Sequence, residues 1–138
     1  SMTNTNFNQQ VIEDFRANKG KVAGAFEGSP VLLLTTVGAK SGREHVTPVM
    51  YLAEGDATYV FASMAGAPNS PAWYHNLVAH PRVTLEIGTE KFEAQATVLD
   101  LAERDRVYAK QAALYHNFAE YEEKTTRVIP VVKLTRAN

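Results

Sequence analysis

Short apolar segments separated by turn-forming residues restrict the fold of this chain more than any other feature. The first three lie close together with no room for a helix between them, which indicates an antiparallel meander and argues against a βαβ repeat. Val31–Leu34 has four consecutive apolar residues, so its strand should be buried on both faces. Pro48 lies inside the second segment and predicts an edge or a bulge there. The predicted strands are Val31–Val37, Val46–Ala53, Ala57–Met64, Arg82–Ile87, Lys91–Leu99 and Pro130–Leu134.

Helical patterns flank and interrupt these strands. Three of them follow a capping residue: Asn8, Ser70 and Asp100. Gly20 should end the first, Pro71 should open the second, and residues 118–124 form a further helical piece. The order predicts an α+β fold, a six-stranded antiparallel barrel with flanking helices. We expect a single domain over residues 2–138, with residues 2–30 as an N-terminal helical segment.

Composition narrows the classes of partner. The 138 residues carry a formal net charge of −1, which does not indicate nucleic acid or an anionic membrane as a general partner. The sequence has no cysteine, which excludes disulfides and thiolate sites and is typical of a cytoplasmic protein. No apolar run is long enough to span a membrane. The apolar residues of 21–30 are interpreted as packing, with a lid or peripheral contact with the inner face of the membrane as alternatives.

The sequence offers little for metal or nucleophilic chemistry. The four histidines, His45, His75, His80 and His116, show no metal-ligand spacing, so we expect no metal site. A nucleophile elbow, a P-loop and a dinucleotide fingerprint are all absent from the sequence. Any chemistry should therefore come from a bound organic cofactor.

The connection between the first two predicted strands carries glycines, cations and a hydroxyl. Its residues of interest are Gly38, Lys40, Ser41, Gly42, Arg43 and His45. Glycine permits backbone angles that aim successive N–H groups inward, and such nests bind anions. We interpret this loop as a cradle for a phosphate group. The alternative is an ordinary charged hairpin tip.

Aromatic residues near the C-terminus recur at every third position, as Tyr115, Phe118 and Tyr121. The spacing turns them to one side of a short helix, where they can roof an apolar pocket and a phenol can give a proton to a substrate. The alternative is an aromatic core stripe, which we favour for Phe118. Trp73 either fills the core or packs near a planar ligand.

Four motifs follow one another in order along the chain. They are Leu33–Thr36 leading into Gly38–Gly42, then Val46–Pro48, then Gly66–Pro68 with Pro71–Leu77, and last Tyr121–Arg127 with Ile129–Val132. Together, over Val31–Leu134, they resemble the deazaflavin-dependent nitroreductase family. These are the class A F-420-dependent oxidoreductases of the split β-barrel flavin-binding superfamily.

The resemblance implies coenzyme F-420, an 8-hydroxy-5-deazaflavin with a phospholactyl and polyglutamate tail, as the cofactor. The implied cofactor-binding residues are Lys40, Ser41, Gly42, Arg43, His45, Thr47, Pro48, Val49, Met50, Ser63, Met64, Ala65, Gly66, Ala67, Trp73 and Asn76. Tyr51, Tyr115 and Tyr121 match aromatic positions near the substrate pocket. The family pattern has arginine where this chain has His45, which would make phosphate affinity fall as the pH rises through neutrality. Some members have tyrosine where this chain has Phe118.

The resemblance also implies a function, which is transfer of a hydride from F-420H2 to a small electron-poor acceptor such as an enone, a quinone or a nitroaromatic. The loop alone does not distinguish F-420 from FMN, because both carry phosphate. An FMN-dependent split-barrel oxidoreductase and a non-catalytic F-420-binding protein are therefore the alternatives. The superfamily often pairs barrels, so a homodimer is a further expectation.

Overall fold

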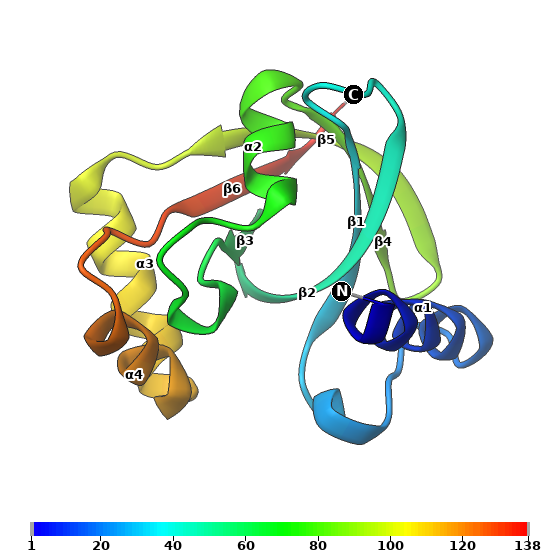
Figure 1. Ribbon diagram of the computed structural model, residues 1–138, viewed down its shortest axis with the longest axis horizontal. Coiled ribbons are helices and arrows are strands. Elements are labelled where there is room, and N and C mark those ends of the chain that lie inside the picture. Colours follow the sequence, from blue (N-terminus) through cyan, green and yellow to red (C-terminus); the bar gives the residue numbers. More distant parts are fainter. Residues whose placement is uncertain (1, 138) are drawn as a thin grey trace.

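Six antiparallel strands form a closed barrel in the computed structural model, which describes residues 2–137 without the side chains of residues 2–5 and 25. The strands are β1 (Val31–Val37), β2 (Glu44–Glu54), β3 (Ala57–Phe61), β4 (Arg82–Ile87), β5 (Glu90–Val98) and β6 (Val131–Arg136). Their order around the barrel is β1-β2-β3-β6-β5-β4, and β4 pairs again with β1 (Figure 1). The predicted six-stranded α+β barrel is confirmed.

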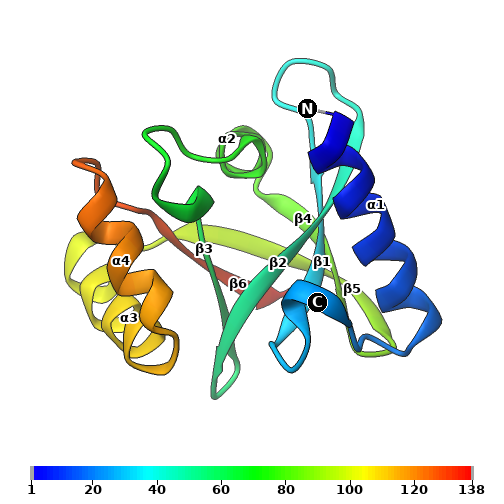
Figure 2. The same cartoon turned by 60° about the horizontal axis from the view of Figure 1, so that its bottom comes forward.

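Four helices surround the barrel on different sides. They are α1 (Met2–Ala17), α2 (Ala72–Ala79), α3 (Leu101–Leu114) and α4 (His116–Lys124), with short 3-10 turns at η1 (Gly24–Phe26) and η2 (Met64–Gly66). Helix α1 packs on β2, and the α3–α4 pair lies on the opposite flank (Figure 2). Helix α2 lies across one end of the barrel, between these two flanks.

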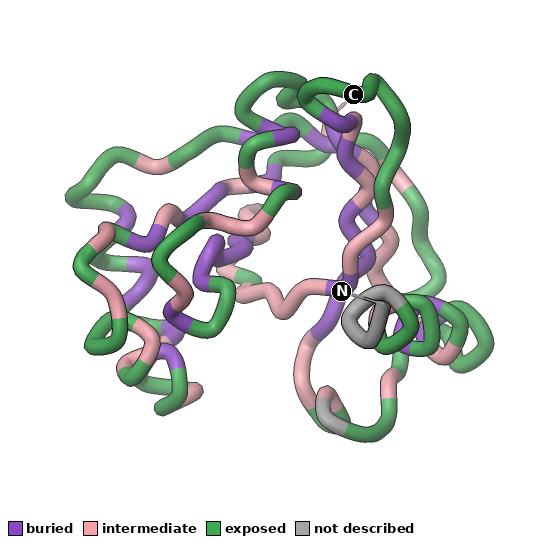
Figure 3. Tube along the Cα trace, viewed as in Figure 1, coloured by how far each residue is buried: buried purple, intermediate pink, exposed green. Residues whose placement is uncertain are grey.

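Strand β1 is buried on both faces, as its run of apolar residues predicts. Leu32 and Leu34 point into the barrel interior, where they join the central apolar cluster. Val31 and Leu33 point the other way and pack beneath α1 with Phe15. Buried positions are accordingly concentrated on β1, β3 and β6 (Figure 3). A third cluster fills the space between β3, β6 and the α3–α4 pair.

Strand β2 changes its neighbours along its length. It pairs with β1 through Met50 and with β3 only from Tyr51 onward. Pro48 therefore lies where β2 has a single strand partner, which agrees with the expected edge position because proline cannot donate to a second ladder. The barrel wall beside Pro48 is completed by loops and helices instead of a strand.

Two predicted helix starts are wrong, and one is confirmed. Helix α1 begins at Met2, so Asn8 lies in its middle and does not cap it. Pro71 occupies the cap position of α2, and the Ser70 hydroxyl instead accepts a hydrogen bond from Arg127. The side chain of Asp100 accepts a hydrogen bond from the backbone N–H of Glu103, as the capping pattern predicts. The signal at Asn8 failed because the helix extends further toward the N-terminus, and the signal at Ser70 failed because a distant arginine uses its hydroxyl.

Four of the six predicted strands differ from the structure at their ends, by one to three residues. The third strand stops at Phe61, before the predicted end, and η2 begins at Met64. Val98, at the last position of β5, is 41% exposed.

Candidate functional site

The loop between β1 and β2 is a tight turn fixed by its own hydrogen bonds. The N–H of Gly38 donates to the carbonyl of Arg43 at 2.7 Å, and the N–H of Gly42 donates to the carbonyl of Gly38 at 3.0 Å. A Cβ atom on Gly38 would lie 2.3 Å from the Ser41 Oγ and 3.0 Å from the His45 Nε2. Glycine at this position is therefore what lets the Ser41 hydroxyl and the His45 ring approach the backbone.

Helix α2 supports this loop from beneath through Asn76. The Asn76 Oδ1 accepts a hydrogen bond from the N–H of Ala39 at 3.0 Å, and its Nδ2 donates to the Thr36 Oγ1 at 3.1 Å. The Asn76 side chain is buried, and these two bonds use one of its two donors and one of its two acceptor positions. Asn76 thus holds the loop on the barrel, and any cofactor contact of this residue would come in addition to that role.

The loop leaves fewer amides available to an anion than the glycine pattern predicts. The amides of Gly38, Ala39, Gly42 and Arg43 all donate to acceptors of the protein. Within residues 2–137, the amides of Lys40 and Ser41 have no such acceptor. The cradle would therefore consist of these two amides together with the Ser41 hydroxyl and the Lys40 ammonium group.

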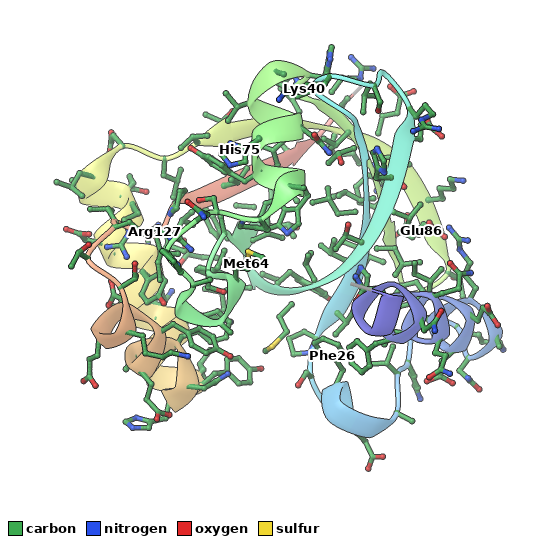
Figure 4. All side chains as sticks on the ribbon, in the orientation of Figure 1. Phe26, Lys40, Met64, His75, Glu86 and Arg127 are labelled. Carbon is green, nitrogen blue, oxygen red and sulfur yellow. The ribbon has the colours of Figure 1, made fainter. Side chains whose placement is uncertain are left out.

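A first hollow of about 970 Å³ opens beside this loop. It is lined by the loop and β2 (Gly38, Ala39, Lys40, Ser41, His45, Val46, Thr47), by α2 (Ala72, Trp73, His75, Asn76) and by α1 (Asn8, Gln9, Ile12). Figure 4 shows Lys40 at the top of this region and His75 below it on α2. Lys40 is exposed, so its charge is free to meet a ligand at the open end.

A second hollow of about 340 Å³ continues from the first. The two share Asn8, Thr47 and Trp73, so together they form one groove along the barrel. The other residues of the second hollow are Phe26, Pro48, Val49, Met50, Phe61, Ser63, Met64, Ala65, Pro71, Phe118 and Tyr121. None of these described lining residues is charged. The groove is thus cationic at one end and apolar at the other.

Tyr121 places a phenol at the apolar end of the groove. The Nδ2 of Asn117, four residues earlier on α4, donates a hydrogen bond to the Tyr121 hydroxyl oxygen at 2.8 Å. The hydroxyl proton of Tyr121 thus remains available for another acceptor. Phe118 is buried against Phe61, with ring centroids 5.6 Å apart, which agrees with the favoured interpretation of Phe118 as a core residue.

Several predicted site residues lie away from the walls of the groove. Tyr51 packs on the central cluster, and Tyr115 packs beside Phe118 at the start of α4. Arg43 is exposed. Gly42, Arg43, Tyr51, Gly66, Ala67 and Tyr115 do not line either hollow. The remaining predicted cofactor residues and Tyr121 all do.

Sequence reasoning missed residues that reach the groove from distant elements. Asn8, Gln9 and Ile12 come from α1 and Phe26 comes from η1, and Asn117 on α4 acts only through its hydrogen bond to Tyr121. The four-residue spacing of Asn117 and Tyr121 on one helix was a usable signal. Nothing in the sequence indicates that α1 forms a wall of this groove, because that depends on its packing against β2.

Residues 2–137 contain no group of three or more histidine, aspartate or glutamate side chains that could hold a metal ion. No helix in this part of the chain is long and apolar enough to cross a membrane.

Known proteins share both the sequence and the fold. The family model described as F420H(2)-dependent quinone reductase matches residues 8–136. The F420H(2)-dependent quinone reductase Rv1261c of Mycobacterium tuberculosis is 36% identical over 126 residues, which cover 88% of this chain and 85% of the relative.

Two solved structures agree with that match. The F420-H2 dependent reductase FDR-A is 36% identical with a TM-score of 0.69, and the alignment covers 76% of this chain and 93% of that one. A structure described as a domain-swapped dimer is 31% identical with a TM-score of 0.71, covering 97% and 99% of the two chains. The resemblance to F-420-dependent oxidoreductases that the sequence motifs indicate is confirmed, and the chain belongs to the F420H(2)-dependent quinone reductase family.

Proposed function

We propose that this protein is an F-420H2-dependent reductase that transfers a hydride to a neutral, electron-poor acceptor, with quinones first and enones and nitroaromatics next. The observation that carries the proposal is the single groove with Lys40 at one end and an uncharged, apolar hollow beside Tyr121 at the other. Family membership supports F-420 as the cofactor.

The residues present fit the two halves of this cofactor. The Lys40 ammonium group, the Ser41 hydroxyl and the two available loop amides suit the phosphate of its tail. The apolar walls from Pro48–Met50 and from Met64 and Ala65 suit a flat ring system, with Trp73 between the two hollows. Bound in this way, F-420H2 would supply the hydride.

The protein's own contribution to the reaction is then positioning and proton supply. The second hollow would hold the acceptor's ring against the cofactor, because its lining offers apolar contact without a charged group. Reduction of a quinone carbonyl also requires a proton. The Tyr121 hydroxyl can donate that proton because Asn117 already satisfies its oxygen.

Two experiments under anaerobic conditions test this function. Visible difference spectra on adding oxidised F-420 or FMN should show binding of F-420 and weak or no binding of FMN. Oxidation of F-420H2 should then be fastest with menadione when an enone and a nitroaromatic are compared at equal concentration. Preferential FMN binding would favour the flavin enzyme, and F-420 binding without oxidation by any acceptor would favour a storage protein.

We also propose a homodimer, supported by the similar structure described as a domain-swapped dimer. Analytical ultracentrifugation should show twice the 15.2 kDa mass of the chain.

Peripheral contact with the inner membrane face is a further proposal, supported by Phe7, which is 41% exposed and lies near Phe26. Co-sedimentation with anionic vesicles should fall on the change Phe7→Ser.

A further inference from the structure

The segment Ser63–Ala67 contributes Ser63, Met64 and Ala65 to one wall of the second hollow, and its backbone has an unfavourable conformation. Met64 and Ala65 have φ angles of 44° and 54°, in the left-handed region that residues with a side chain seldom adopt. Such conformations persist only where surrounding groups hold them in place. The contacts that hold this segment therefore decide whether the wall of the hollow exists.

Arg127 supplies most of these contacts from the far side of the segment. Its guanidinium donates to the carbonyl of Ser63 at 2.9 Å, to the carbonyl of Ala67 at 2.8 Å and to the Ser70 Oγ at 3.1 Å. The two carbonyls lie at the two ends of the strained segment, so one rigid side chain fixes both. Figure 4 shows Arg127 beside the Met64 loop, toward helices α3 and α4.

The environment of Arg127 differs from that of most other arginines in the chain. Five described arginines, Arg16, Arg82, Arg104, Arg106 and Arg136, pair with a carboxylate. In residues 2–137, Arg127 has no carboxylate within ion-pairing distance, and the hydrogen bonds of its guanidinium all go to neutral oxygens of this segment and Ser70. Burial also lowers the pKa of its guanidinium. The partly buried guanidinium of Arg127 is therefore stabilised by its hydrogen bonds to Ser63, Ala67 and Ser70, and not by an ion pair.

Helix α4 completes the contact around the same segment. The Lys124 Nζ donates to the carbonyl of Ala65 at 3.1 Å. A Cβ atom on Gly66 would lie 2.9 Å from the Tyr121 carbonyl oxygen and 3.0 Å from the Lys124 Cβ. The segment therefore lies directly against the turn of α4 that carries Tyr121. The contact between the segment and α4 thus positions both the wall of the second hollow and the Tyr121 hydroxyl.

We propose that Arg127, assisted by Lys124, is a positioning residue that holds Ser63–Ala67 in its strained form and so builds the wall of the second hollow before any ligand enters. The link to cofactor binding rests on the proposed function, in which this hollow takes the deazaflavin ring. Arg127 itself lines neither hollow, so its effect must pass through the loop.

The change Arg127→Met tests this positioning in two ways. Hydrogen exchange of the ligand-free protein should become faster in the peptide that contains residues 63–68 and remain unchanged in β1 and β2. The Kd for oxidised F-420, measured by visible titration, should rise at least about tenfold because the wall is no longer preformed. Arg127→Lys, which can keep one of the bonds, should restore part of both properties.

Arg104→Met is the matched control. Arg104 also donates to a backbone carbonyl, that of Ile129 at 2.8 Å, but its other partners are Asp105 and Glu122 on α3 and α4. This variant should lower the melting temperature while leaving the Kd for F-420 within about twofold, because it does not touch the loop. If Arg104→Met weakens F-420 binding as much as Arg127→Met does, the effect is general destabilisation and the proposal is wrong.

A milder variant guards against loss of folding. Ser70→Ala removes one acceptor of Arg127 and should raise exchange in residues 63–68 and the Kd in the same direction by a smaller factor. Unchanged exchange in this peptide for both Arg127→Met and Ser70→Ala would overturn the proposal. A wild-type protein that binds no F-420 would overturn the proposed function, and the exchange result alone would then decide whether Arg127 fixes the loop.

Discussion

Lys40 is the single lysine or arginine among the described residues that line the first hollow. We predict that Lys40→Ala weakens F-420 binding by about 1–3 kcal/mol, the range for a charge-assisted hydrogen bond. Fluorescence or visible titration measures this directly. Arg43→Ala is the control, since Arg43 is exposed and outside the lining, and it should change affinity by less than about twofold. Equal losses for both variants would mean that the loop attracts the tail only through diffuse charge.

Tyr121 is the residue on which proton supply depends. Tyr121→Phe keeps the ring packing against Phe118, with centroids 5.1 Å apart, and removes only the hydroxyl. We predict that kcat with menadione falls about 100-fold, within the usual range for a lost general acid, while the Kd for F-420 is unchanged. Asn117→Ala should give a smaller fall, because it removes only the partner of the phenol. An unchanged kcat in Tyr121→Phe would leave this residue as packing and point to water as the donor.

At the scale of elements, α1 forms a wall of the groove and is tied to the barrel by an ion pair. The Arg16 Nε and Nη2 donate to the two oxygens of Glu86 on β4, at 3.0 and 2.8 Å. The hydrogen bonds from Arg16 hold the pKa of Glu86 below its usual value of 4.5. The pKa of Glu86 is lower in the folded than in the unfolded protein. The pair therefore stabilises the fold fully above the unfolded pKa, and this contribution is lost as the pH falls through the folded pKa.

Glu86→Gln should therefore cost about 0.5–1 kcal/mol at neutral pH, the upper part of the range for pairs that solvent screens, because the Arg16 side chain is 48% exposed and that of Glu86 is 12% exposed. The change should also flatten the decline of stability below pH 4.5. Urea unfolding at several pH values measures both effects. The double variant with Arg16→Gln should cost little more than Glu86→Gln alone, because the two residues share one interaction. Additive costs would show that the two side chains stabilise the fold separately.

Elements with a strong local pattern were predictable from the sequence. The apolar run of β1 and the cap of α3 at Asp100 are confirmed because burial and capping there follow directly from neighbouring residues. Asn8 and Ser70 carried equally good capping signals, but neither caps a helix, because α1 already begins at Met2 and Ser70 is bonded to a distant residue. Asn8 faces the groove, and Ser70 accepts from Arg127, which is 57 residues away. A capping pattern in neighbouring residues cannot reveal that a residue so far along the chain will bind the same hydroxyl.

At the scale of the whole molecule, the groove is made by contacts between distant segments. The loop after β1 is a short-range feature, so its cationic character was visible in the sequence. The opposite wall comes from α1, and the far end comes from η2 held against α4. These parts meet only once the barrel has closed. The family resemblance supplied most of their predicted roles, and residue patterns alone would have supplied few of them.

In the proposed complex, a deazaflavin lies along this groove with its phosphate at the loop after β1. A crystal structure with oxidised F-420 bound would reveal this placement. We predict the phosphate within hydrogen-bonding distance of the Lys40 Nζ and the Ser41 hydroxyl, and the ring between Pro48–Met50 and Met64–Ala65 with Tyr121 beside it. A complex in which this loop makes no contact with the ligand, or in which the ring lies outside the second hollow, would contradict the claim.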